Sequence, residues 1–174
     1  MNLEMAVTDE MVAIASEVKP TECCLVPEKR EELTTEGGLD VIRRQKAIAA
    51  ACSTLAAGGV RVSLFIEPDL SQIKAAAEVN APVIELHTGT YANAPEGVKR
   101  NAELGRLMEA ASYAAELGLV VNAGHGLDYH NVMPILSLPR LNELNIGHSI
   151  VARALFVGIQ QATVEMVSLL SARR

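Results

Sequence analysis

The amino-acid sequence predicts an α/β protein of the (β/α)8-barrel (TIM-barrel) class, built as a single domain over residues 1–174. Short apolar segments typical of strands alternate strictly with segments of helical periodicity, which requires a parallel sheet with right-handed crossovers. No predicted strand is followed by the GxGxxG turn of an open, doubly wound dinucleotide-binding sheet. Polar residues gather instead near the strand ends, which form the active-site face of a barrel. These residues are Glu4, Glu28, Glu67, Glu85, His87, Asn122, His125, Asn145 and His148.

The elements follow one another in six strand–helix pairs. The strands are predicted at 1–6, 22–26, 61–66, 82–87, 119–123 and 141–146. The helices are predicted at 9–18, 40–57, 69–79, 98–117 and 150–172, with a polar loop before the fourth and a short segment at 130–135. Thr8 is placed to cap the first helix, Pro68 begins the third, and glycines at 58–59 and 118 end two others.

Six strand–helix pairs are two fewer than a closed barrel contains. The chain begins inside a predicted strand, with no turn or helix before it. Two further pairs of ~30 residues each would complete the barrel. We therefore expect the chain to comprise the C-terminal six βα units of a barrel that lacks about its first two, through truncation or through a start at an internal methionine.

Composition and charge narrow the functional classes. The net charge is −6, the isoelectric point is near 5.2, and no cluster of Lys and Arg forms a stripe that could bind successive phosphates. These observations argue against nucleic acid as a partner. No apolar run is long enough to span a bilayer, and the N-terminus has no secretory signal. Cys23, Cys24 and Cys52 show no CxxC spacing, so we expect buried, reduced thiols in a cytoplasmic protein and no structural zinc.

Two turns near the C-terminus are candidates for binding phosphate. Residues 122–126 (NAGHG) and 145–149 (NIGHS) both place a Gly-His pair and a small residue directly after a predicted strand. Glycine leaves backbone N–H groups open to an anion, and a helix that begins near His148 adds a favourable dipole. Loops after the last two strands of a barrel are a recurring phosphate site. The alternative is that these glycines only form tight turns.

Three side chains are candidates for proton transfer. His125 lies between two glycines, where little bulk covers its imidazole, and it can titrate near neutral pH. Glu4 and Glu85 stand in otherwise apolar strands, and a carboxylate that points into a barrel must be paired, hydrated or functional. His87 faces the same way as Glu85 and is expected to pair with it, the alternative being a contact with substrate. A surface loop histidine and an outward-facing Glu4 are the plainer alternatives.

The segment 28–38 (EKREELTTEGG) is longer than an ordinary βα turn. Its charges, the neighbouring Thr34 and Thr35, and a hinge at Gly37 and Gly38 predict a lid that closes over an anionic ligand. A solvated loop without that function is the alternative.

Seven motifs occur along the chain in a fixed order. They are MNLEMA (1–6), CCLVPEKR (23–30), TTEGGLD (34–40), VSLFI (62–66), ELHTG (85–89), VNAGHG (121–126) and ELNIGH (143–148). Taken together they resemble the pyridoxine 5′-phosphate synthase family, several of whose motifs are peculiar to it. The likeness spans the whole chain.

The resemblance implies a cytoplasmic homo-oligomeric barrel, octameric in the family, that needs no metal or organic cofactor. Enzymes of the family condense 3-amino-2-oxopropyl phosphate with 1-deoxy-D-xylulose 5-phosphate, giving pyridoxine 5′-phosphate, phosphate and water. Glu4 matches a glutamate used as an acid/base, His125 the proton donor, and Glu85 a carboxylate that stabilises charge in the transition state. The family's substrate-binding positions match Thr34, Gly126, Gly147 and His148. Imine formation, dehydration and ring closure each require proton transfers in one pocket.

The chain departs from the family's pattern on its N-terminal side. An Asn-x-Asp-His segment with a nearby arginine, and a His-x-Arg group, have no counterpart here. A missing general base costs about 10²–10⁴-fold in rate, and missing strands expose sheet edges. The chain alone is therefore expected to be inactive and poorly soluble. An inactive fragment or remnant of the enzyme is the alternative function. Another phosphate-binding barrel, such as an aldolase, ranks third because no lysine lies at a predicted strand end.

Overall fold

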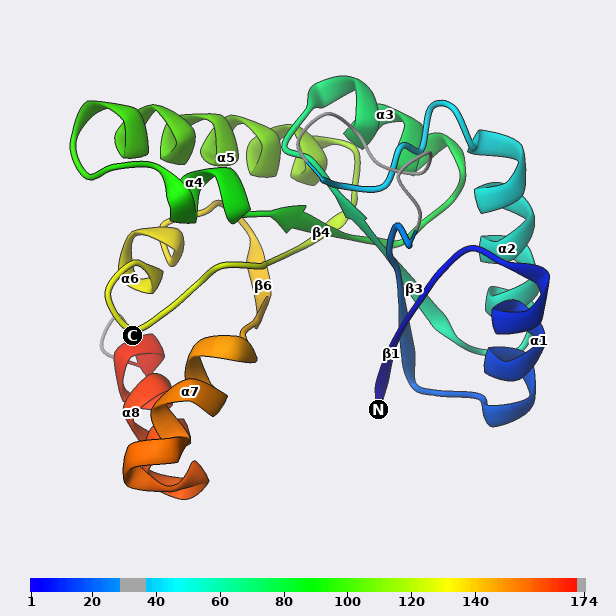
Figure 1. The fold of residues 1–174 in the computed structure, drawn as a ribbon. Coiled ribbons are helices and arrows are strands. Elements are labelled where there is room, and N and C mark those ends of the chain that lie inside the picture. Colours follow the sequence, from blue (N-terminus) through cyan, green and yellow to red (C-terminus); the bar gives the residue numbers. More distant parts are fainter. Residues whose placement is uncertain (29–36, 172–174) are drawn as a thin grey trace.

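A computed structural model describes residues 1–28 and 37–171 (Figure 1). Six parallel strands form one sheet in the order β1-β2-β3-β4-β5-β6, so each strand pairs with the next along the chain. The strands are β1 (Asn2–Met5), β2 (Glu22–Leu25), β3 (Arg61–Ile66), β4 (Val83–His87), β5 (Val120–Gly124) and β6 (Leu141–Asn145). The sheet is a half-barrel, which confirms the predicted α/β class and the partial barrel.

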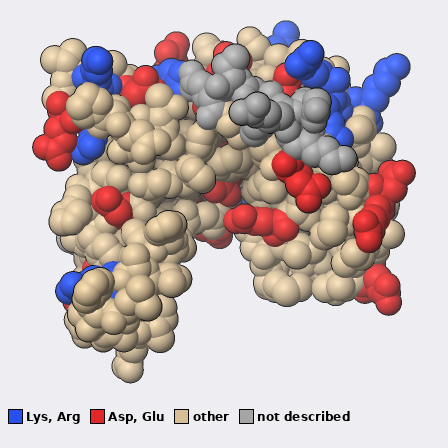
Figure 2. Space-filling model, viewed as in Figure 1, with Lys and Arg blue, Asp and Glu red and all other residues tan. Residues whose placement is uncertain are grey.

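Helices pack along the outside of this half-barrel, while the last two pack against each other in a projecting arm (Figure 1). The helices are α1 (Asp9–Val18), α2 (Gln45–Ala57), α3 (Leu70–Glu78), α4 (Gly89–Asn93), α5 (Val98–Glu116), α6 (Val132–Ile135), α7 (His148–Val157) and α8 (Ile159–Ser171). Within the described part of the chain, β1 and β6 each pair with a strand on one side only. Figure 2 shows the molecule open between the β1 side and the arm formed by α7 and α8.

The two faces of the sheet have different chemistry, and this difference positions the site. Leu64, Ile84 and Val121 are fully buried on the outer face, where the helices cover the sheet. Side chains alternate along a strand, so their neighbours point to the inner face. Phe65 and Glu85 are paired in the register between β3 and β4 and therefore lie side by side on that inner face.

The helix starts follow local hydrogen bonding. Thr8 caps α1 as predicted, since its Oγ1 accepts the N–H of Met11 at 3.2 Å. Asp69, and not Pro68, determines the start of α3: its Oδ1 accepts the N–H groups of Ser71 and Gln72 at 2.8 and 3.0 Å. A short acceptor in the extended conformation satisfies the free donors of the first turn, which proline cannot do.

Two predicted helix boundaries were wrong. The helix expected at 40–57 begins at Gln45, because the Asp40 carboxylate accepts the N–H of Arg43 at 3.1 Å and holds a turn before the helix. The helix expected at 150–172 is divided into α7 and α8 at Gly158, whose φ of 82° is left-handed.

The loop expected between β4 and the fourth helix contains a further short helix, α4. Its Tyr91 is almost fully buried and donates its hydroxyl to the carbonyl of Asn131 at 2.7 Å. This contact ties α4 to the segment after β5. None of the helices in the described part of the chain is long and apolar enough to cross a membrane.

Candidate active site

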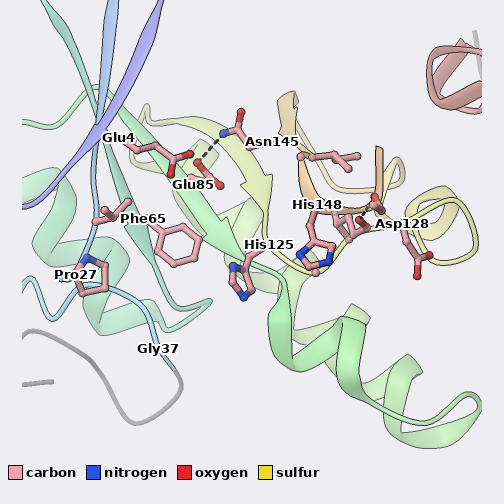
Figure 3. Close-up of a pocket in the computed structure, with 15 residues that line it drawn as sticks. Glu4, Pro27, Gly37, Phe65, Glu85, His125, Asp128, Asn145 and His148 are labelled. Atoms are coloured by element: carbon pink, nitrogen blue, oxygen red, sulfur yellow. Dashed lines mark hydrogen bonds between the residues drawn. The ribbon is translucent and has the colours of Figure 1, made fainter. Parts of the chain in front are cut away.

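A cavity of about 840 Å³ opens at the carboxyl ends of the strands (Figure 3). Its lining comes from β1, from the loops after β2, β5 and β6, and from the inner face of β3 and β4. Six of the seven predicted site residues line it: Glu4, Glu85, His125, Gly126, Gly147 and His148. The seventh, Thr34, lies outside the described residues, as does most of the predicted lid. The fold thus brings together side chains separated by more than a hundred positions in the sequence.

Glu85 is the buried carboxylate of the cavity, with only 4% of its surface exposed. Its Oε2 accepts a hydrogen bond from Asn145 Nδ2 at 2.6 Å and a weaker one from the Cys24 thiol at 3.6 Å. Burial raises the pKa of Glu85 to about 7; the Asn145 hydrogen bond opposes this shift and the charge of Glu4 adds to it. Glu85 therefore exchanges a proton near neutral pH.

Glu4 approaches Glu85 from β1, and the two carboxylates point toward one another (Figure 3). Glu4 is exposed to the cavity, whereas Glu85 is buried behind it. The alternative in which Glu4 faces outward beneath a helix is therefore wrong.

Gly124 makes room for the Glu85 carboxylate. A Cβ atom at this position would overlap with Glu85 Oε1 and would lie only 3.0 Å from the carbonyl oxygen of Asn145. Residue 124 also pairs with Asn145 in the β5–β6 register. The glycine at the end of β5 therefore leaves space for the Glu85 carboxylate, in addition to allowing the turn that follows.

His125 projects its imidazole into the cavity from a strained turn. Its φ is 79° and that of Gly126 is 80°, a left-handed pair that costs a non-glycine residue about 1–2 kcal/mol. Thr88 holds this turn, because its Oγ1 bonds the carbonyls of Gly124 and His125 at 2.7 and 2.6 Å. The histidine side chain is exposed to the cavity, as its glycine neighbours predicted.

Aromatic rings flank the His125 imidazole. Its centroid lies 4.9 Å from that of His87 and 6.1 Å from that of Phe65. Partial burial lowers the pKa of His125 and the neighbouring His87 lowers it further, while the carboxylates of Glu4 and Glu67 act in the opposite direction. The neutral form of His125 is thus favoured, in which one ring nitrogen can take up a proton and the other donates a hydrogen bond.

The expected pairing of His87 with Glu85 was wrong. His87 Nδ1 lies 2.7 Å from Glu67 Oε1, and both side chains are buried. Glu85 is instead bound by Asn145 from β6. Glu67 lies directly after β3, so the neighbouring strand brings it beside the end of β4.

The two Gly-His turns lie against one another. Ser149 Oγ donates to the carbonyl of Leu127 at 2.9 Å, which joins the turn after β6 to the turn after β5. Gly126 is left-handed, and a Cβ there would lie 2.8 Å from Ala92 Cβ. The ten-residue helix α7 begins at His148, as predicted, and its first N–H groups favour an anion at this corner.

Sequence reasoning missed several lining residues. Phe65 was counted only as an apolar strand residue, although it is the β3 neighbour of Glu85. Asp128 also lines the cavity and fixes its own turn by accepting the N–H groups of His130 and Asn131 at 2.8 and 2.9 Å. Period-2 alternation along the third strand would have located Phe65, since it places this residue on the inner face. Over residues 1–28 and 37–171, no group of three or more acidic, histidine or cysteine side chains is arranged to hold a metal ion.

Carboxylates, an imidazole and glycine turns at the carboxyl ends of parallel strands are the arrangement typical of barrel enzymes that perform acid/base chemistry on small anionic substrates. Comparison with known sequences identifies the family. The family described as pyridoxal phosphate biosynthesis protein PdxJ matches residues 1–172, and the chain belongs to this family. A pyridoxine 5′-phosphate synthase from Thioalkalivibrio sulfidiphilus is 58% identical over 166 residues, which are 95% of this chain and 68% of the relative.

Solved structures support the fold alone. A xylose isomerase domain protein from Planctomyces limnophilus superposes with a TM-score of 0.55 at 16% identity, over 87% of this chain and 68% of its own. A HpcH/HpaI aldolase/citrate lyase family protein from Burkholderia cenocepacia superposes with a TM-score of 0.57 at 13% identity, over 97% of this chain and 74% of its own. These neighbours are of the TIM-barrel type and agree with a partial barrel.

Proposed function

We propose that this chain provides the acid/base and phosphate-binding groups of a pyridoxine 5′-phosphate synthase. The reaction condenses 3-amino-2-oxopropyl phosphate with 1-deoxy-D-xylulose 5-phosphate and releases phosphate and water. One observation carries the proposal: Glu4, Glu85 and His125 line the same cavity as the two Gly-His turns. The 58% identity to a pyridoxine 5′-phosphate synthase supports it independently.

The proposed roles follow from the position of each group. His125, exposed in the cavity, donates protons to the leaving oxygen. Glu4, also exposed in the cavity, takes up and returns protons as an acid/base. Glu85, held by Asn145, stabilises positive charge that develops on the condensing carbon–nitrogen skeleton. Each role requires a titratable group within reach of one substrate, which a shared cavity provides.

The phosphate groups of the substrates are assigned to the glycine turns. Gly126, Gly147 and His148 lie beside the N-terminus of α7, whose dipole favours a dianion. Thr34 is proposed as a further substrate-binding residue by its match to the family motif. No step in this scheme calls for a metal or an organic cofactor.

Turnover by purified protein tests the proposal. The 174-residue chain and a version extended by the in-frame codons upstream of Met1 are each incubated with both substrates, and pyridoxine 5′-phosphate and released phosphate are measured. We expect product from the extended version, and our prediction that the chain alone is inactive is tested in the same experiment. If the extended version folds and forms no product, the proposed function is wrong and an inactive remnant is favoured.

Variants make this assay specific. H125Q in the active version should lower kcat by about 10²–10⁴-fold, the contribution of a positioned general acid. H130Q is the matched control, because His130 is also exposed after β5 but does not line the cavity. Equal activity of the two variants would contradict the role of His125.

A homo-oligomer is part of the proposal. The arm of α7 and α8 exposes large apolar side chains; among them, Leu155 is 83% exposed and Phe156 is 85% exposed. The surface of this arm is mostly uncharged (Figure 2). Monomers rarely expose contiguous apolar patches of this kind. Sedimentation analysis should give a mass above that of one chain. A cytoplasmic location is proposed as well, supported by the free, buried Cys23, Cys24 and Cys52.

A further inference from the structure

A row of three titratable side chains runs along one side of the cavity. Glu67 follows β3, His87 ends β4 and His125 follows β5, so three neighbouring strands each provide one member. The first contact, Glu67 Oε1 to His87 Nδ1, measures 2.7 Å. The second is an edge contact between the two imidazoles, with ring centroids 4.9 Å apart and planes inclined by 62°. Only His125 lines the cavity; the other two lie behind it.

The hydrogen bonds around Glu67 define the tautomer of His87. Glu67 Oε1 also accepts the N–H of Gly38 at 2.7 Å, and its Oε2 lies 3.8 Å from Arg106 Nη2. Since the carboxylate acts as an acceptor toward these donors, His87 Nδ1 is the donor in the shared contact. In the neutral ring, the proton is then on Nδ1 and the lone pair is on Nε2.

Gly89 lets the two imidazoles meet. A Cβ atom at this position would lie 2.5 Å from His87 Nε2 and 3.1 Å from His125 Cδ2. The rings therefore converge above a residue without a side chain. Phe65 closes the other side, with its ring centroid 5.0 Å from that of His87. Packing on both sides fixes the plane of the His87 ring.

We propose that Glu67 and His87 are a positioning pair for His125. The Glu67 carboxylate fixes the tautomer and the plane of the His87 ring, and that ring holds the His125 imidazole edge-on in the cavity. That His125 acts in turnover rests on the proposed function. The Glu67–His87 pair, in contrast, is defined by contacts within the chain.

The same carboxylate connects the pair to the end of the predicted lid. Glu67 Oε1 is shared between His87 and the backbone N–H of Gly38, and a Cβ at Gly37 would lie 3.3 Å from His87 Cε1. A displacement of the backbone at 37–38 would therefore change the hydrogen bonding of the carboxylate that orients His87.

If His87 served packing alone, E67Q would leave the tautomer of His87 unchanged. The titratable groups that face His125 are His87, Glu4 and Glu67. Removing the Glu67 charge should lower the pKa of His125, because a nearby anion favours the imidazolium. Removing the His87 ring should raise it, because the neighbouring imidazole and the burial that it provides disfavour the charge. The two substitutions thus have opposite expected signs.

Histidine ring resonances of isotopically labelled protein test the proposal. We compare the full chain with E67Q, which keeps the side-chain volume, and with H87N, whose amide can still donate to Glu67. The signal of His125 is assigned by its loss in H125Q. E22Q is the matched control, since it removes a carboxylate from the Arg61–Glu22 ion pair of 3.0 Å, at the amino ends of the strands.

We expect His87 to be protonated at Nδ1 in the full chain and to lose this preference in E67Q. The pKa of His125 should fall in E67Q, rise in H87N and stay unchanged in E22Q. Unchanged His125 titration in both E67Q and H87N, or a shift of the same sign in both, would overturn the proposal. Because these signals are read without turnover, failure of the proposed function leaves this test intact. In the active protein, E67Q should lower kcat by about 10–100-fold with little change in KM, the size of effect seen when the hydrogen-bond partner of a metal-binding histidine is removed.

Discussion

Replacing Glu85 with glutamine should make the protein more stable than the original chain at alkaline pH, with little advantage in acid. Burial raises the pKa of Glu85 from 4.5 to about 7. The folded chain therefore keeps this proton up to about pH 7, whereas the unfolded chain releases it near 4.5. The contribution of this group to stability is fully present below pH 4.5, the pKa in the unfolded chain. It is lost as the pH rises through about 7, the pKa in the folded chain.

The magnitude follows from the two pKa values. Each pH unit between them is worth about 1.4 kcal/mol, so the full cost of ionising Glu85 in the folded state is about 3 kcal/mol. Between about pH 5 and pH 8 the original chain should lose about 2–3 kcal/mol through this group. Glutamine cannot ionise and can still accept the hydrogen bond from Asn145, so E85Q should not show this loss.

Urea unfolding at these two pH values measures the effect. The quantity of interest is the free energy of unfolding of E85Q minus that of the original chain, which should increase by about 2–3 kcal/mol from pH 5 to pH 8. E116Q, at an exposed position on α5, is the control and should show no such increase. A difference for E85Q that does not vary with pH would refute the reasoning that burial controls this carboxyl group.

Two further predictions concern the surroundings of Glu85. N145A removes the 2.6 Å hydrogen bond and should raise the pKa of Glu85 by about 1–2 pH units above its value of about 7, measured by carbon NMR of the side-chain carboxyl. N142A on the same strand should leave it unchanged, because Asn142 bonds Asn122. G124A should destabilise the fold by about 1–3 kcal/mol through overlap with the carboxylate, whereas G147A, whose Cβ would meet no atom within 4 Å, should be near neutral in thermal unfolding.

The order of strands and helices could be predicted because it depends on local patterns. Thr8 precedes an apolar-periodic segment and caps it as expected. The start of α2 could not be predicted, because the Asp40 turn that precedes it is held by long-range bonds: Gln72 from α3 accepts the N–H of Val41 at 2.9 Å and donates to Asp40 at 3.1 Å. Sequence periodicity contains no information about such contacts.

The residues of the candidate site could be predicted from the sequence, but the hydrogen bonds between them could not. Glu4, Glu85 and His125 stood out because polar groups in apolar strands or between glycines are unusual, and all three line the cavity. The partner of His87 could not be read from spacing, since proximity in the chain favoured Glu85 while the neighbouring strand supplied Glu67. Sheet order and register, which exist only in the fold, decide which carboxylate meets which histidine.

Growth of a pyridoxine auxotroph tests the central claim most directly. Cells receive the 174-residue chain, the version extended upstream of Met1, and the extended version with H125Q or with H130Q. The account predicts growth without added pyridoxine from the extended version and from H130Q, and much slower growth from H125Q. Growth of H125Q at the rate of H130Q, or no growth from an extended version that is expressed and folded, would contradict it.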